Sequence, residues 1–293
     1  TPNHTARELK KGSSTEKEPL SRSLACLFAR VEDGAADSFF TPLARSIEKE
    51  AFRHGYILKY TFSAFDIHHP STFRLIEDNQ ADGVAVLGRC DKELLKFLKQ
   101  YFKYVVYAGL NSLDAKYDQI ICDGGQAAYA AVSRLIELGH KKIAYIGDCT
   151  YESRYVGYYQ TLLTHHIPFD YRYVHPSTQT EEEGNRIMND ILKEEEPPTA
   201  IFCANDCTAL GVLRSLKKGR KKNYFPSVIA IDNIRKSAKT SPMLTTIDIP
   251  KQELAHFALL LLLDQQKKAH KECVRIELPC RLIERDSCTY APS

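Results

Sequence analysis

The chain has 293 residues, 43% of them hydrophobic and 26% charged, a composition typical of a globular protein long enough for two hydrophobic cores. Its net charge of +3 is too small to indicate a nucleic-acid ligand by itself, and no apolar run reaches the length that spans a membrane. The nine cysteines follow no disulfide or zinc-ligand spacing and no secretory signal opens the sequence, so we expect reduced thiols, no metal site and a cytoplasmic protein.

The first twelve residues are short, polar and basic. Asn3 is a good helix N-cap, Gly12 is a good helix stop, and Leu9 is the only large apolar side chain between them. A helix of this length is marginal in water on its own. From these residues alone, a disordered tail and a helix that needs a partner are equally good interpretations. The polar residues 11–22 that follow are typical of a linker.

Strand and helix patterns then alternate. The first series comprises strand 24–29, helix 40–54 with Leu43, Ile47 and Phe52 on its buried face, strand 56–62, helix 72–79, strand 83–87, helix 92–101 and strand 104–108. The second comprises helix 124–138, strand 142–147, helices 153–165 and 181–194, strand 200–203, helix 206–217 and strand 227–231. The apolar run 257–263 indicates a further buried helix face. Two such series predict an α/β protein with two doubly wound parallel-sheet lobes.

Polar and aromatic side chains follow the ends of several predicted strands, where open α/β sheets bind their ligands. Arg154, Asn205 and Asp232 follow three strands of the second series, and the pair Phe39–Phe40 follows the first strand of the chain. Arginine donates paired hydrogen bonds and aspartate accepts them, which suits a molecule with many hydroxyl groups. Each polar residue alone is better explained as a helix cap or a surface charge, and at least one of the two phenylalanines as a core residue. Their combination predicts a ligand site.

Five segments resemble signatures of the LacI/GalR family of bacterial transcription regulators. They are residues 138–147 (LGHKKIAYIG), Arg154 with the following x-x-Gly-Tyr, residues 202–211 (FCANDCTALG), residues 231–233 with LTTI at 244–247, and residues 282–288 (LIERDSC). The start of the chain, Pro-Asn-x-x-Ala-x-x-Leu, resembles the hinge helix of the same family. The likeness therefore runs through essentially the whole chain in order.

The resemblance implies a fold of the type I periplasmic-binding-protein class, with two lobes joined by three crossovers. Residues 1–21 would be the hinge and a linker, with a helix-turn-helix head expected before them. Residues 22–121 and 250–277 would form the N-terminal lobe. Residues 122–249 and 278–293 would form the C-terminal lobe.

The resemblance also implies a function. The chain would be the effector-binding and dimerisation core of a sugar-responsive regulator, in particular a repressor, acting as a homodimer and without a cofactor. Effector contacts would fall on Arg154, Asn205 and Asp232, with Phe39 and Phe40 on the facing lobe.

Two further residues are candidates for ligand contacts. Arg89 follows a predicted strand, and Gln179 stands where several relatives have an aromatic residue that stacks on the ligand. The loop before Arg154 is shorter than in many relatives. The two phenylalanines and the lack of an aromatic residue at 179 are compatible with a galactoside or another hexose glycoside.

The hinge would enter the DNA minor groove of the operator, with a leucine wedged between base steps and basic side chains near phosphates. The hinge residues assigned to DNA are Asn3, Ala6, Arg7, Leu9 and Lys10.

The alternative function is a periplasmic-type sugar-binding protein of a transport system. An enzyme is disfavoured, because no G-x-G-x-x-G follows the first strand and no P-loop is present. His140 precedes a strand on the side away from the expected ligand, so we interpret it as structural.

Overall fold

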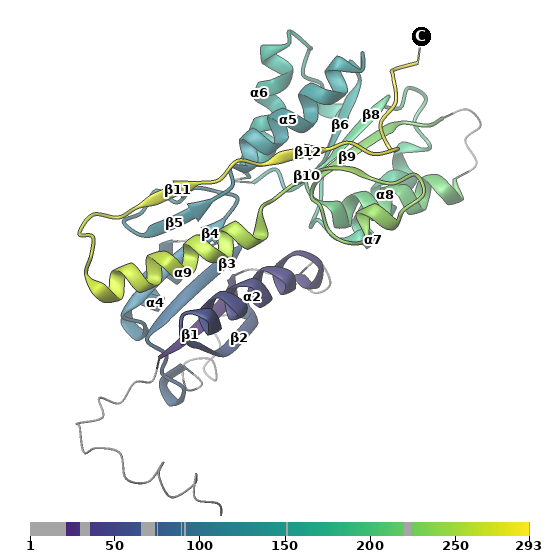
Figure 1. The fold of residues 1–293 in the computed structure, drawn as a ribbon. Helices are drawn as coiled ribbons and strands as arrows, with labels where there is room; N and C mark the ends of the chain where they lie inside the picture. Colours follow the sequence, from purple (N-terminus) through teal and green to yellow (C-terminus); the bar gives the residue numbers. More distant parts are fainter. Residues whose placement is uncertain are drawn as a thin grey trace, which may run out of the picture.

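The computed structural model describes residues 22–29, 36–65, 74, 76–88, 90, 92–150, 152–219 and 224–292. The predictions for the hinge residues and for Arg89 lie outside these ranges. Two lobes, each built on a six-stranded sheet, follow one another from lower left to upper right in Figure 1. The predicted fold class is confirmed by this arrangement.

The first lobe has a wholly parallel sheet in the order β11-β5-β4-β3-β1-β2. Its strands are β1 (Ser23–Ala29), β2 (Ile57–Phe65), β3 (Gly83–Gly88), β4 (Tyr104–Gly109), β5 (Asp118–Ile121) and β11 (Arg275–Glu277). Its helices are α2 (Ala36–Arg53), α4 (Lys92–Tyr101) and α9 (Lys251–Lys267). Alternate residues of β1 point to opposite faces: Leu24 and Cys26 pack with α2 and α9, whereas Ala25 and Leu27 pack with α4.

The second lobe has the order β12-β10-β9-β8-β6-β7, and only the pair β10–β12 is antiparallel. Its strands are β6 (Ile143–Gly147), β7 (Val174–Pro176), β8 (Ala200–Cys203), β9 (Ser227–Asp232), β10 (Thr245–Asp248) and β12 (Arg281–Ile283). Its helices are α5 (Gly124–Glu137), α6 (Ser153–Thr164), α7 (Glu181–Ile191) and α8 (Asp206–Lys218), with short 3₁₀ turns at Tyr171–Tyr173 and Ser237–Lys239. Helices α5 and α6 share one core cluster, and α7 and α8 share the other.

Helices α7 and α8 approach each other closely because glycine stands at both contact points. A Cβ atom at Gly211 would lie 2.0 Å from the carbonyl oxygen of Glu181, and one at Gly184 would lie 2.1 Å from that of Thr208. Any larger residue would force the two helices apart.

The chain passes from one sheet to the other three times: after Ile121, after Asp248 and after Glu277. In Figure 1, the yellow segment from β11 to β12 runs from the first lobe into the second. The exact bounds of the two lobes given in the sequence analysis stay a prediction.

Two expectations about α2 were wrong. The helix begins at Ala36, four residues before the start expected at 40, and Pro42 lies inside it. Phe52 is 78% exposed, whereas Leu43, Ile47 and Ala51 are buried. Successive helical residues are turned by about 100°, so residues 43, 47 and 51 lie on the same buried face. Phe52, one residue further, points toward solvent.

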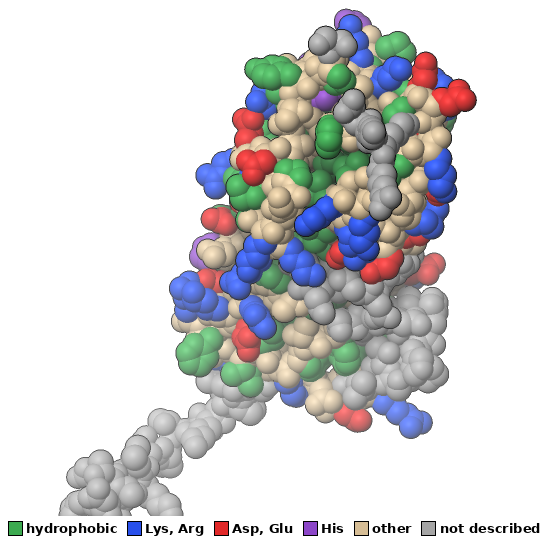
Figure 2. Space-filling view, turned by 90° about the vertical axis from the view of Figure 1, so that its right-hand side faces the viewer, with side chains coloured by type: hydrophobic (Ala, Val, Ile, Leu, Met, Phe, Trp, Pro, Cys, Tyr) green, Lys and Arg blue, Asp and Glu red, His purple; other side chains and the backbone are tan. Residues whose placement is uncertain are grey.

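Acidic and basic side chains are mixed with apolar ones on the face shown in Figure 2, in keeping with the small net charge. Within the described ranges, none of the helices combines the length and the hydropathy needed to cross a bilayer.

Candidate functional site

Four predicted ligand residues converge at the carboxyl edge of the second sheet. Arg154 is the second residue of α6, Gln179 lies between β7 and α7, Asn205 caps α8, and Asp232 ends β9. Strand β6 precedes Arg154, β7 precedes Gln179, β8 precedes Asn205, and β9 ends in Asp232. These four strands are neighbours in the sheet. Each of the four residues is at most 9% exposed. The fold therefore gathers polar side chains from distant parts of the sequence into one buried cluster.

Arg154 is fixed by Glu152, the residue that caps α6. The Glu152 carboxylate accepts hydrogen bonds from Nε and Nη2 of Arg154 at 2.8 and 2.9 Å. Nη1 donates to the carbonyl oxygen of Ala204 at 2.7 Å, and Nη2 also donates to Oε1 of Gln179 at 3.1 Å. Burial acts to lower the pKa of Arg154, but the charges of Glu152 and Asp232 outweigh it and the pKa is raised. The guanidinium is therefore a permanent positive charge in the cluster.

Asp232 carries a buried carboxyl group on a strained backbone. Its φ is +121° and that of Asn233 is +47°, conformations that L-residues rarely adopt. Burial raises the pKa of Asp232 to about 6, with Arg154 and Lys251 acting in the opposite direction. Within the described part of the chain, no group donates a hydrogen bond to this carboxylate. Such strain is typical of functional sites, where the surrounding structure must hold it.

Asp206 stabilises the strained turn at residues 232–234 through two hydrogen bonds. It is fully buried, and its carboxylate accepts from the Ile234 amide at 2.9 Å and from the Thr246 hydroxyl at 2.6 Å. Burial, followed by the neighbouring charge of Asp232, raises the pKa of Asp206 to about 7. Asp206 thus positions Asp232 through the residues that follow it.

A hydrogen bond joins Asn205 to Gln179. Oδ1 of Asn205 accepts from the amide and the hydroxyl of Thr208 at 2.9 and 2.7 Å, which caps α8. Its Nδ2 donates to the carbonyl oxygen of Gln179 at 3.0 Å, and Gln179 has a φ of +68°. A carboxamide nitrogen carries two N–H donors, and among the described residues Asn205 Nδ2 donates one hydrogen bond.

Lys251 connects this cluster to the first lobe. Its Nζ donates to the carbonyl oxygen of Asp232 and lies 4.9 Å from the centre of the Phe39 ring. Phe39 packs edge-on against Phe40, with ring centres 5.1 Å apart. Lys251 thereby links Phe39, which is largely in the core, to the polar cluster, and the half-buried Phe40 contacts Phe39.

Sequence reasoning missed Glu152, Asp206 and Lys251. Glu152 lies two residues before Arg154, and Asp206 lies directly after Asn205, so proximity to predicted residues was an available signal. Lys251 follows the end of β10 by three residues at a crossing between the sheets. His140 lies at the opposite edge of the second sheet, where its ring binds Thr199, Ser227 and the Thr289 carbonyl.

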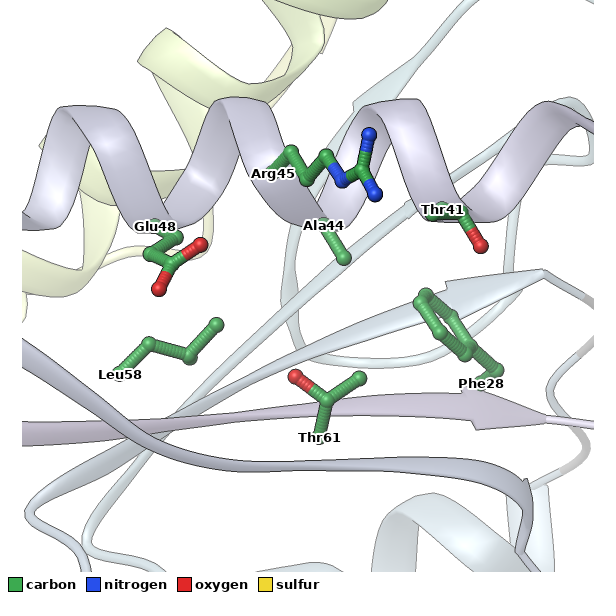
Figure 3. A pocket seen from close by; sticks show the side chains of 7 residues that line it. All are labelled: Phe28, Thr41, Ala44, Arg45, Glu48, Leu58 and Thr61. Carbon is green, nitrogen blue, oxygen red and sulfur yellow. The ribbon is translucent and has the colours of Figure 1, made fainter. Parts of the chain in front are cut away.

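A separate open pocket of about 260 Å³ lies in the first lobe between α2 and strands β1 and β2. Figure 3 shows side chains from α2 and from the two strands around it; they are Phe28, Thr41, Ala44, Arg45, Glu48, Leu58 and Thr61. None of the predicted ligand contacts lines it.

Comparison with known proteins shows the family. Residues 132–288 match the model of a periplasmic binding protein-like domain. The chain is 34% identical over 265 residues to the HTH-type transcriptional repressor CytR of Escherichia coli (strain K12), covering 87% of this chain and 77% of the repressor. The chain belongs to the LacI/GalR family of transcriptional regulators. Its described residues form the effector-binding core of such a regulator.

Solved structures of low identity share this fold. A LacI family transcriptional regulator from Enterococcus faecium with bound ribose has a TM-score of 0.78 at 23% identity, covering 92% of this chain and 100% of that one. A complex of the transcriptional regulator CelR with cellobiose has a TM-score of 0.80 at 22% identity, covering 91% of this chain and 84% of that one.

Proposed function

We propose that this LacI/GalR core belongs to a sugar-responsive repressor and binds a small carbohydrate between its two lobes. The polar contacts would come from Arg154, Gln179, Asn205 and Asp232 of the second lobe. The aromatic contact would come from the Phe39–Phe40 pair of the first lobe. Two structural neighbours are complexes with ribose and with cellobiose, which supports a carbohydrate as the ligand class.

The observation that carries the proposal is the largely buried carboxylate of Asp232 within electrostatic reach of the fixed guanidinium of Arg154. No described group donates a hydrogen bond to the carboxylate of Asp232, so its oxygens are available to a ligand. Sugar hydroxyls can donate to Asp232 and accept from Arg154 in one molecule. The half-buried Phe40 ring would cover the apolar face of the sugar.

A ligand held by both lobes would change their relative orientation. In a homodimer, this change would alter the spacing of the two hinges on operator DNA, so that effector and operator affinities become reciprocally coupled. The homodimer, the hinge contacts of residues 3–10 and a cytoplasmic location belong to this proposal. The alternative of a transport binding protein is disfavoured by the 34% identity to a repressor along most of the chain.

Isothermal titration calorimetry with ribose, cellobiose, galactose and simple galactosides tests the site. The variant Asp232→Asn keeps the side-chain shape and removes the charge. We expect it to weaken binding by about 10- to 100-fold, the worth of one or two charged hydrogen bonds. Phe40→Leu should weaken binding more modestly.

Arg172→Ala is a matched control, because Arg172 is an exposed arginine of the same lobe paired with Asp170. It should bind like the wild type. Equal affinity of Asp232→Asn and wild type would place the ligand elsewhere, and the α2 pocket of Figure 3 would be the next region to test.

A further inference from the structure

Two cysteines stand where the chain passes between the lobes. Cys122 directly follows β5, at the first crossing, and Cys280 directly precedes β12, at the third. The two positions are 158 residues apart in sequence but belong to neighbouring segments. Neither has a role in the proposed sugar site.

The register of the sheet brings these segments together. Strands β5 and β11 pair in parallel, with Glu277 opposite Ile121. The pairing continues past the strand ends, since the Leu278 amide donates to the Ile121 carbonyl oxygen at 2.8 Å. Cys122 belongs to the core cluster against which Cys280 packs, and the two thiols are close enough for each to shift the pKa of the other. Figure 1 shows β11 and β5 side by side at the point where the yellow segment leaves the first lobe.

The two thiols differ in accessibility and acidity. Cys122 is fully buried, whereas Cys280 is half-buried. Interaction with the Cys122 thiol lowers the pKa of Cys280, while the same interaction, followed by burial, raises the pKa of Cys122. A partly accessible thiolate is the nucleophile in cysteine chemistry. Cys280 is therefore suited to react first with an oxidant, and Cys122 to react second with Cys280.

We propose that Cys122 and Cys280 form a reversible redox pair that closes to a disulfide between the first and third lobe crossings, with a hydroperoxide as the oxidant. The Cys280 thiolate attacks one oxygen of the peroxide, the O–O bond breaks, and Cys280 becomes a sulfenic acid as the other oxygen leaves as water or an alcohol. The Cys122 sulfur then attacks the Cys280 sulfur. A disulfide forms, the S–O bond breaks, and the departing hydroxide takes the proton of the Cys122 thiol and leaves as water. Two thiols are oxidised, and one peroxide is reduced.

The second step needs no access from solvent, because its nucleophile comes from the neighbouring segment of the same core cluster. The disulfide would join two of the three crossings covalently and restrict movement between the lobes. Thiol reductants would reverse it by exchange. Any effect on sugar affinity rests on the proposed function, whereas formation of the bond does not.

The experiment treats the full chain with one equivalent of hydrogen peroxide and maps its cysteines by peptide mass spectrometry. In the wild type we expect a 122–280 disulfide-linked peptide, the loss of two titratable thiols, and the recovery of both with dithiothreitol. Cys122→Ser should instead accumulate a dimedone-reactive sulfenic acid at Cys280. Cys280→Ser should leave Cys122 reduced under the same treatment.

Cys273→Ser is the matched control, since Cys273 is an exposed thiol in the loop before β11. It should form the 122–280 disulfide at the wild-type rate. The oxidised wild type should also melt at a higher temperature than the reduced protein, and Cys280→Ser should show no such shift. The proposal is overturned if no 122–280 linkage forms, or if Cys280 couples to Cys273 instead. Failure of every sugar to bind would leave these readouts unchanged, so the two proposals fail separately.

Discussion

Replacing Glu152 by glutamine should destabilise the second lobe by about 3 kcal/mol. The side chains of Glu152 and Arg154 are 0% and 8% exposed, and the carboxylate accepts from two guanidinium nitrogens at 2.8 and 2.9 Å. Breaking a buried ion pair by removing one partner costs about 3 to 5 kcal/mol, because the other charge stays buried. Glutamine keeps one acceptor oxygen, and Asp232 still faces the arginine, which places the expected cost at the lower end.

A double-mutant cycle separates the pair from its surroundings. Arg154→Met should also destabilise the protein, but the double variant should cost less than the sum of the single ones by about 1 to 3 kcal/mol. Urea denaturation followed by far-ultraviolet circular dichroism measures these values, since the chain has no tryptophan. Glu183→Gln is the control: its partner Arg186 is 58% exposed, and such surface pairs contribute at most about 1 kcal/mol. A loss below about 1 kcal/mol for Glu152→Gln, or strictly additive single variants, would refute a buried, charged pair.

Three other predictions concern packing and pH. Gly211→Ala should lower the free energy of unfolding by about 1 to 3 kcal/mol by urea denaturation, because its Cβ would meet the Glu181 carbonyl oxygen at 2.0 Å; wild-type stability would contradict the close helix contact. Burial lowers the pKa of His140 below its ordinary 6.5, so the folded state favours the neutral imidazole. Its contribution to the free energy of unfolding is therefore complete above pH 6.5 and is lost as the pH falls. The Tm of the wild type should therefore drop more between pH 7 and pH 5 than that of His140→Gln, and parallel curves would refute this. Hydrogen bonds to Asp264 and then to Asp118 raise the pKa of His270, so its contribution is complete below pH 6.5 and is lost as the pH rises through the raised value. In His270→Gln, the fall of Tm with rising pH should be smaller than in the wild type. An unchanged fall would contradict the stabilising role of the His270 charge.

The sequence predicted those parts of the structure that depend on local patterns. Strand and helix alternation predicted the α/β class. The clustering of Arg154, Asn205 and Asp232 could be predicted because each stands at the carboxyl end of a strand or in the segment that follows it, and their role as ligand contacts stays a prediction. Lys251 was missed because its partners, Asp232 and Phe39, come from two different lobes, and only the crossing after β10 brings them together. Short strands were missed for another reason. Strands β7, β11 and β12 have three residues each, too few to show an alternating pattern.

Glu152 illustrates why burial cannot be predicted from spacing. An acidic residue two positions before an arginine is ordinary on a protein surface, and Arg172 with Asp170 forms such an exposed pair in this chain. Only the packing of α6 under the neighbouring strand ends makes the Glu152–Arg154 pair a buried one. The side chains are similar, and their environments give them different roles.

The discontinuous make-up of the first lobe has a consequence for synthesis on the ribosome. Its edge strand β11 and its covering helix α9 come from residues 251–277, after nearly the whole second lobe has been made. Until then, the apolar face of β1 and α2 lacks the helix that covers it, and the edge of β5 lacks its neighbour. Such exposed apolar surface and open strand edges invite aggregation and chaperone binding. The nascent chain must therefore carry an unfinished first lobe while residues 122–250 are made, and that lobe closes only after residues 251–277 emerge.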